Sequence, residues 1–272
     1  MAEGAGNGVV ARGLTRSGPA TTARAGAPIR LAVAVVFGLA IVSVLSFSKP
    51  GGARVLTPIS VRTAVLSADG TDTYALETAN SSVRAIAPVS NTGGNLRTVF
   101  WPSDAPAQPD ELTCATWTGA ASDRTQQGAA LRVSTSPTGS VRALTVTKNV
   151  YLDPTGVFNV HIWNEATNTI EWITNVDLRP TFSQPALPGV TPSARPLPWR
   201  LCARVAAMTL EFKAWRTEES EPAWGDPAHG ATVQLPEDAP RVGYTGWYVG
   251  HLEPGTAASF TELESAPYVP AR

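Results

Sequence analysis

The sequence predicts an all-β protein, a sandwich of two antiparallel sheets, preceded by one N-terminal transmembrane helix. Beyond residue 55, brief segments of alternating apolar and polar residues recur, with turn signals about every eight to twelve residues. Val, Thr and Trp are frequent in these segments, and they favour strands. No convincing amphipathic helix follows the N-terminal apolar segment. Many short strands without helices pack best as two face-to-face sheets.

The N-terminal segment is expected to anchor the chain in a membrane. Residues 31–47 carry no charge, and as a helix they reach about 26 Å, the short end of a membrane span. Residues 1–30 are predicted to be a disordered basic tail, and arginine predominates there over a single acid, Glu3. Positive charge on this side predicts a cytoplasmic tail and an extracytoplasmic C-terminal part. The arginines are Arg12, Arg16, Arg24 and Arg30.

A cleaved signal peptide is the alternative interpretation of this segment. Ser46, Phe47 and Ser48 offer small residues at a cleavage-like spacing. However, the basic region and the apolar stretch are both longer than is usual for a signal peptide, so we favour an uncleaved anchor. The expected organisation is a tail (1–30), a transmembrane anchor (31–48), a linker (49–54) and an extracytoplasmic β-sandwich domain (55–272).

The predicted strands follow from alternation and from the turns between them. The early strands are weak, and the loop at 102–111 contains prolines and aspartates that a central strand excludes. The middle of the chain is clearer, because each apolar face is opposed by Asn, Thr, His and aromatic residues. A Pro-rich loop and a second long loop are expected at 180–198 and 217–240. The predicted strands are 60–66, 82–87, 99–101, 114–117, 128–134, 141–151, 157–164, 242–252 and 258–263.

The segment 199–216 predicts an antiparallel hairpin. Leu201, Ala203 and Val205 alternate with polar residues, and after a short turn Leu210 and Phe212 do the same. A period of two with one apolar face is typical of half-buried strands. We therefore expect this hairpin to line the core with one face and to expose the other.

The charge and the cysteines of the chain argue against a nucleic-acid-binding protein and against a metal site. Charged residues make up only 16% of the chain and the net charge is −1, so no basic stripe for nucleic acid is present. Cys114 and Cys202 are predicted to form a disulfide if the domain is exported. The alternative, a metal site, is disfavoured because His161, His229 and His251 have no ligand spacing to either cysteine.

A family resemblance rests on several of these segments. The strands QQGAALRV, LTVTKNV, VFNVHIW, WRLCARV and LEFKAW, followed by EPAW, occur in this order between 126 and 224. The series resembles the concanavalin A-like lectin and glucanase fold, above all its laminin G-like and exported glucanase-related members. That resemblance implies a jelly-roll sandwich, and the family includes lectins, glycoside hydrolases and adhesive modules. The Ala-, Thr- and Pro-rich composition behind an Arg-rich anchor also resembles exported proteins of actinobacteria such as mycobacteria.

The sequence gives little support for catalysis. Glucanases need two carboxylates facing one glycosidic bond, and no Glu-x-Asp-x-Glu stretch occurs. Glu218, Glu219 and Glu221 are clustered in an expected solvated loop, and no Gly-x-Ser-x-Gly elbow is present. We expect no cofactor. The alternative is a calcium ion of the kind that laminin G-like domains often hold, but it is disfavoured because an Asp-x-Asp loop is lacking.

A polar and aromatic sheet face is the predicted ligand-binding site. Sugar rings stack on aromatic side chains while their hydroxyls bond to amides and charged groups. The alternative is that Trp163 and Trp215 cover the sheet beneath a loop such as 180–198. The predicted site residues, expected on one face, are Asn149, Asn159, His161, Trp163, Arg204, Lys213 and Trp215.

The favoured function is a membrane-anchored, non-catalytic carbohydrate-binding protein of the cell envelope. Its expected partners are an envelope polysaccharide and the membrane, the latter through the N-terminal helix, with no nucleic acid. A glycoside hydrolase acting on envelope polysaccharide and a structural or protein-interaction domain are the two alternatives.

Overall fold

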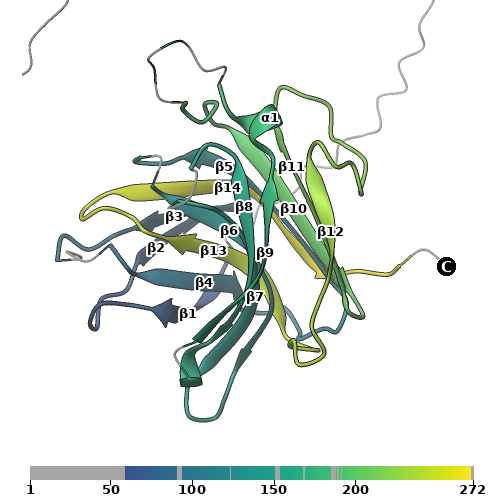
Figure 1. Ribbon diagram of the computed structural model, residues 1–272. Helices are drawn as coiled ribbons and strands as arrows, with labels where there is room; N and C mark the ends of the chain where they lie inside the picture. The colour runs from purple at the N-terminus through teal and green to yellow at the C-terminus, as the bar shows by residue number, and fades with distance from the viewer. Residues whose placement is uncertain are drawn as a thin grey trace, which may run out of the picture. The chain divides into compact units, whose positions relative to one another are not determined.

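The computed structural model describes residues 59–270 except 91–93, 123, 151–153, 168, 185–187, 189 and 191. The described residues form two antiparallel seven-stranded sheets, which pack face to face as a β-sandwich (Figure 1). In spatial order, sheet A contains β1 (Val61–Ser67), β4 (Arg97–Pro102), β13 (Tyr244–Gly250), β6 (Gln126–Thr135), β7 (Val141–Lys148), β8 (Val157–Asn164) and β9 (Thr169–Asp177). Sheet B contains β12 (Gly230–Gln234), β11 (Thr209–Arg216), β10 (Trp199–Ala206), β5 (Glu111–Gly119), β14 (Ala257–Pro267), β3 (Ser82–Ile86) and β2 (Ala75–Ala79).

The main core lies between the sheets. The alternation of apolar and polar residues along the strands determines which side chains enter it. On the predicted hairpin, now β10 and β11, Leu201 pairs with Ala214 and Ala203 with Phe212, and all four face the core. Trp247 of sheet A is 1% exposed and donates its indole N–H to the carbonyl of Cys114 in sheet B, at 2.9 Å. The predicted two-sheet antiparallel sandwich is therefore confirmed.

The last two strands occupy interior positions. β13 lies between β4 and β6 in sheet A, and β14 lies between β5 and β3 in sheet B. Each therefore joins strands that are distant in the sequence, which gives both sheets a non-local topology.

Sheet A curves toward the side that faces away from sheet B. β1 and β7 are separated in the sheet by β4, β13 and β6, yet they come into contact. Leu66 of β1, Ala143 of β7 and Trp163 of β8 belong to a second apolar cluster, which contains no residue of sheet B. Since this cluster lies on the outward side, that side of sheet A is concave. We call it the concave face.

A buried arginine ties three loops together. Arg132 of β6 is 1% exposed, and its guanidinium donates to the carbonyls of Pro109, Ala207 and Pro240 at 2.6 to 3.1 Å. Its backbone N–H donates to the Glu111 carboxylate at 2.7 Å, and Glu111 is fully buried. A buried arginine is stable only when its donors are satisfied, so Arg132 fixes these loops at one position.

Several segments differ from the sequence prediction. β2, β9 and β12 are strands, although the first two are absent from the predicted strands and β12 was expected to be loop. The expected loop 180–198 begins within a single helical turn, α1 (Arg179–Phe182), and a short 3-10 helix, η1 (Glu165–Thr167), precedes β9. β12 is a short edge strand, and its ladder of hydrogen bonds is formed with β11. No local sequence pattern predicts this pairing.

The predicted anchor at 31–48 lies outside the described residues. Within the described part of the chain, no helix combines the length and apolar character needed to cross a membrane.

Candidate functional site

The structure divides the seven predicted site residues between two surfaces. Asn149, Asn159, His161 and Trp163 belong to the β7–β8 region of sheet A, whereas Arg204, Lys213 and Trp215 belong to β10 and β11 of sheet B. The expectation of one shared face is therefore wrong, because the two groups lie on opposite sheets.

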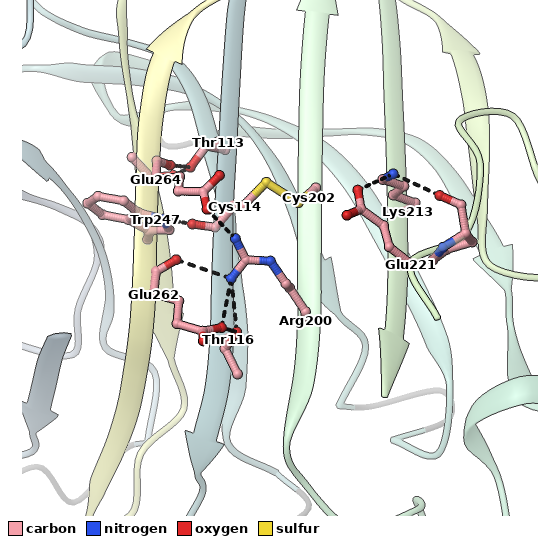
Figure 2. The surroundings of a disulfide bond; sticks show 12 residues. Thr113, Cys114, Thr116, Arg200, Cys202, Lys213, Glu221, Trp247, Glu262 and Glu264 are labelled. Carbon is pink, nitrogen blue, oxygen red and sulfur yellow. Dashed lines mark hydrogen bonds and ion pairs between the residues drawn. A yellow bond between two sulfur atoms is a disulfide. The ribbon is translucent and has the colours of Figure 1, made fainter. Parts of the chain in front are cut away.

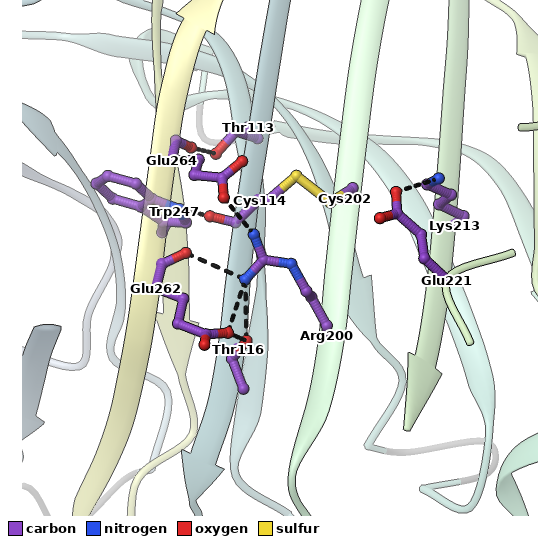
Figure 3. Close-up of polar contacts among 10 residues, drawn as sticks. All are labelled: Thr113, Cys114, Thr116, Arg200, Cys202, Lys213, Glu221, Trp247, Glu262 and Glu264. Carbon is purple, nitrogen blue, oxygen red and sulfur yellow. Dashed lines mark hydrogen bonds and ion pairs between the residues drawn. A yellow bond between two sulfur atoms is a disulfide. The ribbon is translucent and has the colours of Figure 1, made fainter. Parts of the chain in front are cut away.

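The sheet B residues form a satisfied charge network beneath a loop. Lys213 is 4% exposed, and its Nζ donates to Glu221 Oε1 at 2.6 Å (Figure 3). The same Nζ donates to the Pro222 carbonyl at 2.8 Å. Trp224 covers this ammonium at 4.6 Å from its ring centroid. Arg204 pairs with Glu211 at 2.6 Å and also lies against the Trp224 ring, at 4.2 Å. These cations already have carboxylate and aromatic partners.

The predicted disulfide is confirmed and lies at the centre of this surface. Cys114 of β5 and Cys202 of β10 are directly paired across the two strands (Figure 2). Beside it, Arg200 donates to Glu264 at 2.7 Å and to Glu262 at 3.1 Å. Trp215 is 4% exposed and packs against the disulfide. Trp215 therefore covers this sheet, in line with the structural alternative for that residue.

The clustered glutamates lie in the loop that follows β11 of sheet B. Glu218 and Glu219 both pair with Arg216, at 2.7 and 2.5 Å, and Glu221 pairs with Lys213. Each of these carboxylates therefore interacts with a cation of β11, in the sheet opposite to the one that carries His161 and the asparagines.

The concave face of sheet A carries a network of uncharged polar side chains. Tyr248 donates its hydroxyl to Gln126 at 2.6 Å, and Gln126 donates in turn to the Thr147 hydroxyl. Asn149 donates to Asn159 at 2.8 Å. Trp163 donates to Thr145 at 2.9 Å. The resulting surface of amides, hydroxyls and aromatic rings is of the kind that binds neutral hydroxylated ligands.

His161 is the unsatisfied member of this face. It is 5% exposed, and neither ring nitrogen has a hydrogen-bond partner in the described structure. Burial, together with the nearby Arg97 guanidinium, lowers the pKa of His161 to about 4. At neutral pH the ring is therefore uncharged and offers one donor and one acceptor, neither of which is in use.

Trp172 and Ile170 of β9 border the concave face and were missed in the sequence. They are 49% and 47% exposed, and the Trp172 ring lies 4.5 Å from the His161 ring. Trp172 is paired with His161 in the β8–β9 register. The alternation of Ile170 and Trp172 with the polar residues Thr169 and Glu171 was the available signal.

Arg97 supplies positive charge near the same face. Its guanidinium carbon lies 5.5 Å from the Trp163 ring, and it donates to Ser67 at 3.2 Å. Among the described residues, no group of three or more His, Cys, Asp or Glu side chains could hold a metal ion.

Comparisons with known proteins give fold-level similarity alone. No family model and no curated protein sequence matches the chain. It is similar to the carbohydrate binding module CBM66 from Bacillus subtilis, at 9% identity and a TM-score of 0.44 over 75% of this chain and 94% of that one. A Bacillus subtilis protein of unknown function with a galectin-like fold matches at 8% identity and a TM-score of 0.43, over 76% of this chain and 89% of that one. The Ca²⁺/Man3GlcNAc-bound exoplasmic/lumenal domain of VIP36 matches at 11% identity and a TM-score of 0.43, with the same coverage.

Proposed function

We propose that the chain binds carbohydrate through the concave face of sheet A. The observation that carries this proposal is His161, a neutral and unpartnered imidazole within a field of amides and hydroxyls, beside a half-exposed tryptophan. The proposed site keeps only those predicted site residues that belong to sheet A and adds Trp172. Its members are Asn149, Asn159, His161, Trp163 and Trp172.

The chemistry of the face matches a sugar ring. A hydroxyl group is both donor and acceptor, as is a neutral imidazole, so a sugar hydroxyl satisfies His161 without a change of charge. Trp172 offers an aromatic surface on which the apolar face of a pyranose stacks. Because the Trp172 ring lies against His161, a ligand that enters beside Trp172 meets both groups at once.

Replacement of Trp172 by alanine is expected to weaken binding of a soluble polysaccharide about tenfold, since one stacked ring contributes about 1.4 kcal/mol. The half-exposed side chain adds little to the fold, so the melting temperature is expected to change little. Calorimetric titration with arabinogalactan and with a soluble glucan, alongside an assay for reducing ends, measures affinity and cleavage together. Trp224→Ala, in the loop that covers Lys213 of sheet B, is the matched control and should bind as the wild type does. Equal losses in both variants would contradict the assignment.

His161→Leu separates binding from folding. The variant removes a buried polar group that has no partner, and such a group costs about 1 to 3 kcal/mol. We therefore expect the variant to unfold at a higher temperature than the wild type while losing at least tenfold in polysaccharide affinity. Thermal unfolding and titration of the same sample test this pair of opposite effects. Unchanged affinity in a folded His161→Leu protein would exclude the concave face.

The cellular setting is part of the proposal. Residues 31–48 would hold the domain at the outer surface of the cell membrane, where envelope polysaccharide is accessible. A reporter fused after Arg272 is expected to be active outside the cytoplasm, and the protein is expected to pellet with membranes. A soluble processed form that starts near Lys49 would instead identify a cleaved signal peptide.

A further inference from the structure

We infer that a cavity at one end of the sandwich binds an acidic sugar, a ring that carries a carboxylate or a phosphate. The cavity has a volume of about 360 Å³. Residues of both sheets line it, including Trp117 of β5, Trp199 of β10 and Lys148 of β7, together with the loop around Arg195. Trp117 and Trp199 belong to the core between the sheets, so this site is distinct from the outward-facing concave face.

The charge of the lining favours an anion. Lys148 and Arg195 contribute to the wall, and no aspartate or glutamate is among the described lining residues. Arg195 uses its Nε to donate to the Ser183 carbonyl at 3.1 Å. No carboxylate pairs with Arg195 among the described residues. A guanidinium without a carboxylate partner, at a cavity wall, matches the bidentate geometry of a carboxylate or phosphate.

Two unused polar groups point to the same ligand class. The Trp117 indole N–H is buried and has no acceptor, and the side chain is 1% exposed. The Ser122 hydroxyl, also in the lining, is buried without a partner. An indole N–H can only donate, so a ligand that satisfies it must bring an acceptor oxygen. Buried polar groups normally have a hydrogen-bond partner. Two unpaired groups in one cavity wall therefore indicate that a ligand supplies the missing partners.

The size and the walls of the cavity define the rest of the ligand. Its volume lies near the lower end of the range for small-molecule sites, which suits one sugar ring with its anionic group. The rings of Trp117 and Trp199, 6.1 Å apart between centroids, supply the aromatic wall. Trp199 donates its N–H to the Pro196 carbonyl at 3.1 Å, and its ring packs against Phe182 with 4.5 Å between the centroids, so it forms a fixed wall of the cavity.

The experiment is a calorimetric titration of the full chain in a detergent without a sugar headgroup. The probes are glucuronate, glucose 6-phosphate and glucose, which share a ring and differ in charge. We expect one of the two anionic probes to bind at least tenfold more tightly than glucose. Arg195→Gln should then lower that affinity by at least about tenfold, the usual effect of losing a charged hydrogen bond. Trp117→Phe keeps a ring and removes the donor, and about a threefold loss is expected.

Arg84→Gln, which removes an exposed arginine paired with Glu77 on β2 and β3, is the matched control and should bind as the wild type does. Glucose binding as tightly as both anions, or no binding of either anion at millimolar concentration, would overturn the inference. So would an Arg195→Gln protein that is folded and binds normally. The inference is independent of the concave face, because His161→Leu should leave glucuronate and glucose 6-phosphate binding unchanged.

Discussion

Replacing Cys114 and Cys202 together by alanine is expected to lower the free energy of unfolding by about 4 kcal/mol. The disulfide joins residues 88 positions apart, and a loop of that length restricts the unfolded chain by about this amount in the chain-entropy model. It also crosses β5 and β10 in the middle of sheet B. Urea denaturation of the oxidised wild type and of the double variant measures the difference.

The wild type in the presence of reductant is the natural control for this comparison. Its urea midpoint should approach that of the double alanine variant, because both lack the cross-link. Oxidised and reduced wild type that unfold at the same urea concentration would show that the cross-link contributes nothing to stability.

Glu111 is expected to make the domain less stable as the pH rises from about 4.5 to about 8. Burial raises the pKa of Glu111 from 4.5 to about 7, which outweighs the opposing effects of its hydrogen bonds and of the Arg132 charge. The folded state therefore prefers the protonated carboxyl. The stabilisation is complete below the unfolded pKa and is lost as the pH rises through 7. A shift of this size corresponds to about 3 kcal/mol.

Glu111→Gln is the test of that assignment. Glutamine keeps an oxygen that can accept the Arg132 N–H bond and does not titrate. The unfolding free energy is measured for both proteins at pH 5 and at pH 8. Between these pH values the wild type should lose about 3 kcal/mol more stability than the variant does. Parallel pH profiles would show that Glu111 titrates in the folded state as it does in the unfolded chain.

The sandwich was predictable from sequence because alternation is a local property. Leu201, Ala203, Leu210 and Phe212 point to one side of a hairpin whatever else the chain does, and the structure places all four in the core. The Cys114–Cys202 bridge was likewise predictable, given the expectation of export and the absence of metal-ligand spacing to either cysteine. β12 could not be predicted, because its strand character comes from pairing with β11.

The candidate site was less predictable because it depends on which strands become neighbours. Alternation predicts equally well that His161 and Lys213 point away from the core. It does not predict that they belong to different sheets. The role of Lys213 is set by Glu221 and Trp224, which come from a loop whose path the sequence does not reveal. The unpartnered state of His161 is a property of the assembled concave face, visible only once β9 brings Trp172 beside it.

The interior positions of β13 and β14 impose an order on biosynthesis. A nascent chain that has reached only residue 243 lacks one inner strand of each sheet, so β4 and β6 are unjoined, as are β3 and β5. Such a chain carries unpaired strand edges, which are prone to aggregate. Both sheets can thus be completed only after the ribosome has made residues 244–267, so the sandwich closes at the very end of translation.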